Sequence, residues 1–95
     1  MGMITIHAQY QSRFREITRI PGESFQLAQP LVSELASIIT KKYGPMMESL
    51  LIDQDTHELN TRGTLYLDSK GRRVYMEDTL ADGETIAFLV GIAGG

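Results

Sequence analysis

Hydrophobic and polar residues alternate along three stretches of the chain, the pattern of strands half-buried in a sheet. These stretches are Met3–Ala8, Phe14–Ile20 and Gly63–Asp68. The first two are separated by a short polar segment, which predicts a hairpin. The third runs into the tight-turn sequence DSKG at residues 68–71, so a short returning strand is expected over Arg72–Met76.

Two further apolar runs lack this alternation. Leu50–Ile52 is expected to form a short strand. Ile86–Val90 is continuously apolar, which is typical of a strand buried on both faces. Between them, the polar segment Asp53–Arg62 predicts a loop.

One segment has the period of a helix. Between Pro30 and Tyr43, apolar residues recur at spacings of three, four and seven and form one broad stripe. Pro30 suits the first helical turn, where a missing N–H costs nothing. Lys41 and Lys42 favour the last turn, and Gly44 followed by Pro45 ends the helix.

The order of these elements predicts an α+β fold: a mixed sheet of four to five strands with one main helix across one face. A parallel pairing of the first and last strands would place the run 86–90 in the centre of the sheet. The 95 residues suggest a single domain spanning 1–95, with residues 91–95 as a flexible C-terminal tail.

Composition narrows the classes of partner. The net charge of −3 argues against a nucleic-acid partner, since the six arginines and three lysines form no basic stripe. The longest late apolar run, residues 86–93, is far shorter than the about 20 residues needed to span a bilayer, so no membrane association is expected. The absence of cysteine fits a reducing compartment, and we expect a cytoplasmic location.

The residues offer no active site of their own. His57 lies among carboxylates in the loop 53–62, but a metal site needs three or four ligands in a defined geometry, so a solvated loop and no metal are expected. No serine lies in a nucleophile-elbow pattern, and no glycine-rich loop joins a strand to a helix. If chemistry involves this chain, another protein is expected to perform it.

The sequence ends in Ala93-Gly94-Gly95, directly after the most apolar strand. A frayed end without a role is one interpretation. The other is a reacting terminus, because glycine has no Cβ and passes through a channel only as wide as the backbone. A terminal carboxylate is ionised at neutral pH and is a poor electrophile. An enzyme would have to activate it, for example as an acyl-adenylate.

The segment LADGETIAFLVGIAGG, residues 80–95, resembles the C-terminal sequence of the MoaD/ThiS family of ubiquitin-like sulfur carriers. The matching residues are Asp82, Gly83, Glu84, Ala87, Phe88, Ala93, Gly94 and Gly95. The resemblance implies a β-grasp fold, in agreement with the order of elements above. Val90-Gly91 stands where MoaD-like carriers often have two prolines, which leaves the pathway open between molybdopterin, the thiazole of thiamine and another product.

The resemblance also implies a role for each residue of the tail. Gly95 would carry the carboxylate that is adenylated and converted to a thiocarboxylate. Gly94, Ala93 and Ile92 would contact the partner, and Phe88 would be core or docking surface, with core favoured because the strand reads as buried. The chain would not be an enzyme and would bind no cofactor. ATP and Mg²⁺ would be used by a partner adenylyltransferase of the ubiquitin-activating type, and a synthase subunit would accept the sulfur.

Two alternatives share this fold. The chain could be a ubiquitin-like modifier whose carboxylate is joined to lysines, or a β-grasp interaction module with an inert tail. A free-standing enzyme is the weakest alternative, because no set of residues supports one.

Overall fold

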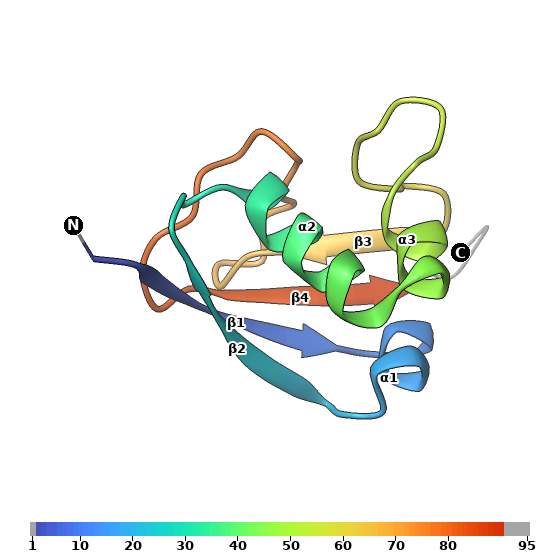
Figure 1. Ribbon diagram of the computed structural model, residues 1–95, viewed down its shortest axis with the longest axis horizontal. Helices are drawn as coiled ribbons and strands as arrows, with labels where there is room; N and C mark the ends of the chain where they lie inside the picture. The colour runs from blue at the N-terminus through green and yellow to red at the C-terminus, as the bar shows by residue number, and fades with distance from the viewer. Residues whose placement is uncertain (1, 91–95) are drawn as a thin grey trace.

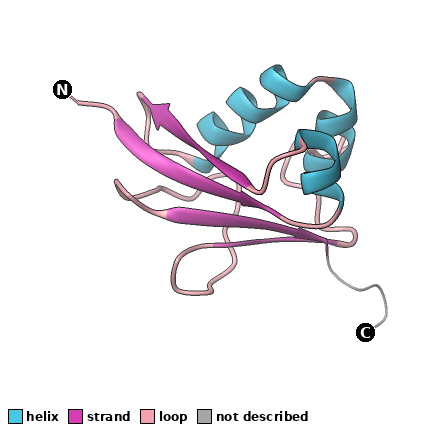
Figure 2. Ribbon diagram, turned by 90° about the horizontal axis from the view of Figure 1, so that it is seen from below, coloured by secondary structure: helices cyan, strands magenta, loops and turns pink. Residues whose placement is uncertain are grey.

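The computed structural model describes residues 2–90, which form one four-stranded sheet with helices on one side of it (Figure 1, Figure 2). The elements in chain order are β1 (Ile4–Tyr10), α1 (Arg13–Thr18), β2 (Gly22–Leu27), α2 (Val32–Tyr43), α3 (Pro45–Leu51), β3 (Thr64–Leu67) and β4 (Thr85–Val90). The predicted mixed sheet with one main helix across one face is confirmed.

The strand order is β2-β1-β4-β3, with β1 antiparallel to β2 and parallel to β4, and β4 antiparallel to β3. The predicted parallel pairing of the first and last strands is therefore confirmed, and both lie in the centre. The expectation that residues 86–90 are buried on both faces is wrong. Ile86 and Phe88 are buried, whereas Ala87 and Leu89 are half-buried, because only one face of the sheet carries helices.

The predicted helix is α2, which packs its apolar stripe against the sheet. Pro30 lies just before the helix rather than in its first turn. The N–H groups of Val32 and Ser33 donate to the carbonyls of Asp78 and Met76, at 3.0 and 3.1 Å. A neighbouring loop thus supplies the acceptors that a capping side chain would otherwise provide.

The predicted hairpin of Phe14–Ile20 with the first strand is wrong. Residues 13–18 form α1, and β1 pairs instead with β2, which the sequence did not predict. Phe14 and Thr18 are buried one helical turn apart, with Ile17 half-buried beside them. This three-to-four-residue spacing fits a helix, but in so short a segment it coexists with apparent alternation.

Two further strand predictions are wrong. Leu50 and Leu51 belong to α3, which begins at Pro45 and buries Met47 and Leu51; Ile52 makes only an isolated bridge to Leu59. Residues 72–76 form no strand; Leu67 and Arg73 make an isolated bridge, and the Val74 N–H donates to the Tyr66 carbonyl at 2.9 Å. The predicted loop over residues 53–62 is confirmed as irregular backbone.

Candidate functional site

Four of the predicted site residues, Ile92, Ala93, Gly94 and Gly95, lie outside the described residues. The fifth, Phe88, lies near the C-terminal end of β4. The geometry of the candidate site is therefore that of the strand leading to residues 91–95 and of the elements around its end.

β4 pairs with β1 over residues 85–88 and with β3 over residues 87–90, so both neighbouring strands flank its middle. β1 pairs with it through Tyr10, opposite Phe88, and the N–H of Gln11 then donates to the Phe88 carbonyl at 3.1 Å. On the other side, Thr64 of β3 lies opposite Val90. The backbone is thus fixed by both strands up to Phe88 and by β3 alone up to Val90, the last described residue.

Phe88 is a core residue, the alternative that the sequence favoured over a docking surface. Its side chain is 3% exposed, and its ring centroid lies 5.6 Å from those of Tyr10 and Phe14 and 5.7 Å from that of Tyr66. Burial raises the pKa of Tyr66 to about 12. This aromatic cluster ties β1, α1, β3 and β4 together close to the end of β4.

At the other end of β4, the turn that carries the family resemblance is held to β1. The Thr5 N–H donates to the Asp82 carboxylate at 2.7 Å, and the Gly83 N–H donates to the Thr5 carbonyl at the same distance. Gly83 has φ +85°, a conformation that favours glycine. Glu84 accepts a hydrogen bond from the Ala81 N–H at 3.0 Å. These three residues thus have structural roles, about one strand length away from the end of β4.

The helix-free face of the sheet carries an apolar patch that the sequence did not identify. Leu65 lies opposite Leu89, and Leu67 lies opposite Ala87. All four are half-buried and lie on the face opposite Phe88 and Tyr66, because successive residues of a strand point to opposite faces. The alternation in residues 63–68 placed Leu65 and Leu67 together, but only the register with β4 places Leu89 beside them.

A half-buried carboxylate fastens α2 to the sheet near the end of β1. Glu23 of β2 accepts hydrogen bonds from Tyr10 at 2.8 Å, from Tyr43 at 2.5 Å and from the Lys42 ammonium. Burial alone would raise the pKa of Glu23, but the hydrogen bonds from Lys42, Tyr43 and Tyr10 outweigh it and lower that pKa. Burial, followed by the bond to Glu23, raises the pKa of both tyrosines. The cluster is a structural anchor for α2.

Other kinds of site receive no support from residues 2–90. Within this range, no three histidine, aspartate or glutamate side chains gather as metal ligands would. His57 has φ +62° and donates its N–H to the Asp53 carbonyl at 2.7 Å, as a turn residue. None of the described helices is long and apolar enough to cross a membrane.

No protein-family model and no curated protein matches the chain. Solved structures do match. The HVO 2177 protein of Haloferax volcanii superimposes with a TM-score of 0.81 at 20% identity, over 99% of this chain and 89% of that one. The small archaeal modifier protein 1 of Methanosarcina acetivorans gives 0.74 at 17% identity, over the whole of both chains. A candidate molybdopterin converting factor subunit 1 from Pyrococcus furiosus gives 0.71 at 19%, over 94% and 99%.

The chain has the ubiquitin-like β-grasp fold. The fold predicted from the resemblance to MoaD/ThiS proteins is therefore confirmed, with structures of a modifier and of a candidate molybdopterin factor subunit among those it matches. Within this β-grasp domain, β4 is a central strand held on both sides. The comparisons leave the roles of residues 92–95 as predictions.

Proposed function

We propose that this β-grasp protein is a cytoplasmic sulfur carrier whose reacting group is the carboxylate of Gly95. A partner adenylyltransferase of the ubiquitin-activating type activates that carboxylate, and a synthase subunit then takes the sulfur, molybdopterin being the favoured product. Thiamine thiazole or another sulfur-containing product is the alternative destination. Gly94, Ala93 and Ile92 are the residues that contact the partners.

The chemistry follows from the state of the carboxylate. With a pKa of about 3.3–3.7, a chain-terminal carboxylate is ionised at neutral pH and resists nucleophilic attack. In the partner, a carboxylate oxygen attacks the α-phosphorus of ATP, pyrophosphate leaves, and an acyl-adenylate forms. A sulfur nucleophile then attacks the acyl carbon and AMP leaves. When that nucleophile is sulfide, the C–S bond forms as the C–O bond to AMP breaks, and the resulting thiocarboxylate holds one sulfur in place of one oxygen.

The observation that carries the proposal is the placement of β4. A strand in the centre of the sheet, with Phe88 in the core and Val90 still paired to Thr64, gives the following residues a fixed starting point. When a partner binds the domain, the point from which residues 91–95 leave the sheet is therefore fixed relative to the partner. Preorganisation of this kind lowers the entropy cost of bringing a reacting group into an active site.

The apolar patch on the helix-free face supplies a second contact for the partner. Leu65 and Leu89 lie beside the end of β4 and are half-exposed. In the proposed complex this patch packs against the partner while residues 91–95 enter its active site. Loss of the patch then weakens binding of the carrier without changing the chemistry at the carboxylate.

The test is the intact mass of the protein after incubation with ATP, Mg²⁺, a sulfide source and the adenylyltransferase of its own cell. The mass before incubation establishes that Gly95 is the final residue. The expected gain is that of one sulfur replacing one oxygen. Deletion of Gly95 should abolish the gain, whereas deletion of Gly2, which removes the same mass from an open position, should leave it intact. An unchanged mass with an active adenylyltransferase would contradict the proposal.

A modifier function is the second candidate, favoured by the match to a small archaeal modifier protein. It uses the same activation, but a lysine amine of a target attacks the acyl carbon and an isopeptide bond forms. An immunoblot of the source cell with an antibody to this protein distinguishes the two. A ladder of conjugates that disappears on deletion of Gly95 supports the modifier, and free protein alone supports the carrier.

A further inference from the structure

Three of the six arginines lie on or next to one short helix. Arg13 and Arg15 belong to α1, and Arg19 follows its last turn. All three are exposed, and no carboxylate of residues 2–90 lies within 4.0 Å of their guanidinium groups. We call Arg13, Arg15 and Arg19 the α1 arginine surface. In a chain of net charge −3, it is a local concentration of positive charge that no carboxylate of residues 2–90 neutralises by an ion pair.

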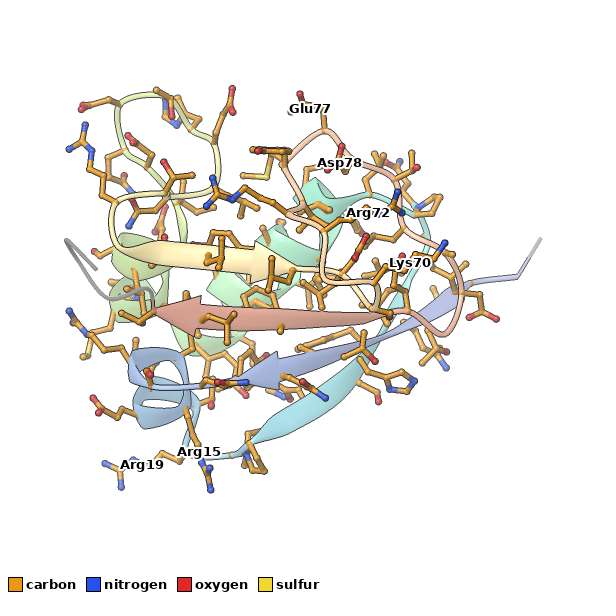
Figure 3. The ribbon with its side chains drawn as sticks, turned by 180° about the vertical axis from the view of Figure 1, so that it is seen from behind. Arg15, Arg19, Lys70, Arg72, Glu77 and Asp78 are labelled. Carbon is orange, nitrogen blue, oxygen red and sulfur yellow. The ribbon has the colours of Figure 1, made fainter. Side chains whose placement is uncertain are left out.

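The α1 arginine surface lies at the same end of the molecule as the end of β4. Phe14 of α1 packs against Phe88, with ring centroids 5.6 Å apart, and Gln11 just before α1 bonds the Phe88 carbonyl. Figure 3 shows Arg15 and Arg19 side by side, pointing away from the body of the protein below α1. A partner that engages residues 91–95 therefore approaches the end of the molecule at which α1 lies.

Two open hollows flank α1, and the three arginines are among the residues that line them. One, of about 500 Å³, is lined by Arg15 together with Gln9, Gln11 and Ser12, among others. The other, of about 460 Å³, lies between α1 and the junction of α2 and α3. Its lining includes Arg13, Arg19, half-buried Ile17 and Met46, which is 69% exposed. Glu16 is its one acidic residue, so cationic side chains predominate there.

The basic residues of the turn after β3 differ from the α1 arginines in their position and, for Arg72, in having an ion-pair partner. Arg72 lies 3.4 Å from the Asp68 carboxylate, within the turn that follows β3. That turn is fixed to the opposite end of β4, because the Thr85 N–H donates to Ser69 Oγ at 2.9 Å. Lys70 and Arg73 in the same region are exposed and serve as a control in which two positive charges are removed elsewhere on the surface.

We propose that the α1 arginine surface docks onto an acidic face of the adenylyltransferase that activates Gly95. This inference rests on the proposed function and names the chemistry of the partner: carboxylates beside the entrance to its active site, with an apolar side chain that fits against Ile17 and Met46. Complementary charge of this kind raises the rate of productive encounter and fixes orientation. In this proposal the arginines bind the partner and take no part in the chemistry at the carboxylate, so they govern KM rather than kcat.

The experiment measures adenylate formation by the adenylyltransferase at varied carrier concentration, alongside direct binding of the two proteins by calorimetry. The triple variant Arg13→Gln/Arg15→Gln/Arg19→Gln should raise KM and Kd about 10-fold or more at low ionic strength, with kcat unchanged. The difference should shrink in about 1 M salt, where the Debye length is about 3 Å. Replacement of the three arginines by lysine should restore most of the lost affinity, since the charge is kept.

The control is Lys70→Gln/Arg73→Gln, which removes charge at the opposite end of β4 and should leave KM within about twofold of the parent. A triple variant with unchanged KM, or a control variant that loses as much affinity, would overturn the docking surface. Thermal unfolding of each variant checks that the exposed substitutions leave the fold intact.

The two proposals fail in different ways. If the parent protein binds the adenylyltransferase but is never adenylated, the function of Gly95 is wrong, and the binding data alone still decide the role of the arginines. If the parent protein does not bind the enzyme at all, both proposals are wrong. If it is adenylated equally well with and without the arginines, only the docking surface is wrong.

Discussion

The two ends of β4 are held in opposite ways. The N-terminal end is fastened by polar contacts: the Asp82 carboxylate and the Gly83 N–H bind both backbone groups of Thr5, and Ser69 binds Thr85. The C-terminal end is fastened by aromatic packing around Phe88, and the α1 arginines, which have no carboxylate partner among residues 2–90, lie at the same end of the molecule. The residues 82–84 that carry the resemblance to MoaD/ThiS proteins thus build the strand at one end, while the proposed chemistry lies beyond the other.

The largest effect on stability is expected at the aromatic end. Phe88→Ala removes a ring that contacts Tyr10, Phe14 and Tyr66, and should lower the free energy of unfolding by about 3–5 kcal/mol. Urea unfolding followed by circular dichroism measures it. A loss below about 1 kcal/mol would show that Phe88 does not hold this end of the strand.

A smaller loss is expected at the polar end. Gly83→Ala places a side chain on backbone with φ +85°, which costs about 1–2 kcal/mol. Gly2→Ala is the matched control, since a Cβ there meets nothing within 4 Å and the change should stay within about 0.5 kcal/mol. The folded Gly83→Ala protein should still be adenylated with the parental kcat. A reduced kcat in the folded variant would contradict the separation of the two ends.

The elements predicted correctly from the sequence are those with several repeats of one period or with glycine and proline at their ends. α2 has twelve residues of helical spacing, and Gly44-Pro45 end it. β3 and β4 are bounded by turns that contain glycine. The same reasoning failed for α1 and α3, of six and seven residues, because the helical and strand periods cannot be told apart over so short a length. It also failed for β2, whose residues Gly22–Leu27 run into the segment before the helix without a break in pattern.

The candidate site was predictable only where it is local in sequence. The Asp82-Gly83 turn, the apolar strand and the terminal glycines form one continuous motif, so they could be recognised. The patch of Leu65 and Leu89 depends on the register between two strands. The α1 arginine surface depends on where α1 packs, and that segment was predicted to be a strand. Neither relation is present in the sequence pattern alone, because both are set by tertiary contacts.

The aromatic end also has one polar anchor, and it should respond to pH. The folded-state pKa of Glu23 is lowered, so its contribution to stability is present above the unfolded value of about 4.3 and is lost as pH falls through the folded value. At pH 7, Glu23→Gln should therefore reduce the free energy of unfolding by about 1–2 kcal/mol.

Urea unfolding at a series of pH values measures this difference, which should shrink towards zero as the medium becomes more acidic than about pH 4. Glu16→Gln on exposed α1 is the matched control and should show no such dependence. The pH dependence expected from Tyr10 and Tyr43 runs the other way. Because the pKa of each is raised in the folded state, their contribution to stability is present below about pH 10 and is lost as the pH rises from there towards the folded-state pKa. A gap between parent and Glu23→Gln that stays constant from pH 7 to pH 3 would exclude the ionised carboxylate as the anchor.

The smallest effect on stability is expected on the helix-free face. Leu89→Gln should change the free energy of unfolding by less than about 1 kcal/mol, because Leu89 is half-exposed and its neighbour across the strands is Leu65. In the proposed complex it should nevertheless raise the KM for adenylation. Leu67→Gln, on the same face but further from the end of β4, should raise the KM less. Equal effects of the two substitutions would show that the contact is not centred on the end of the strand.

The parallel pairing of β1 with β4 has a consequence for biosynthesis. It joins His7–Tyr10 to Thr85–Phe88, so one strand of the central pair is made early and the other late. While the chain is being synthesised, β1 has only β2 as a partner, and a two-stranded ribbon is marginally stable in water. The aromatic cluster closes only once Phe88 has left the ribosome. A chain that ends before β4 therefore lacks the central strand pair and does not present a folded domain to the partner enzymes. Only a chain synthesised through the end of β4 can fold into a substrate for them.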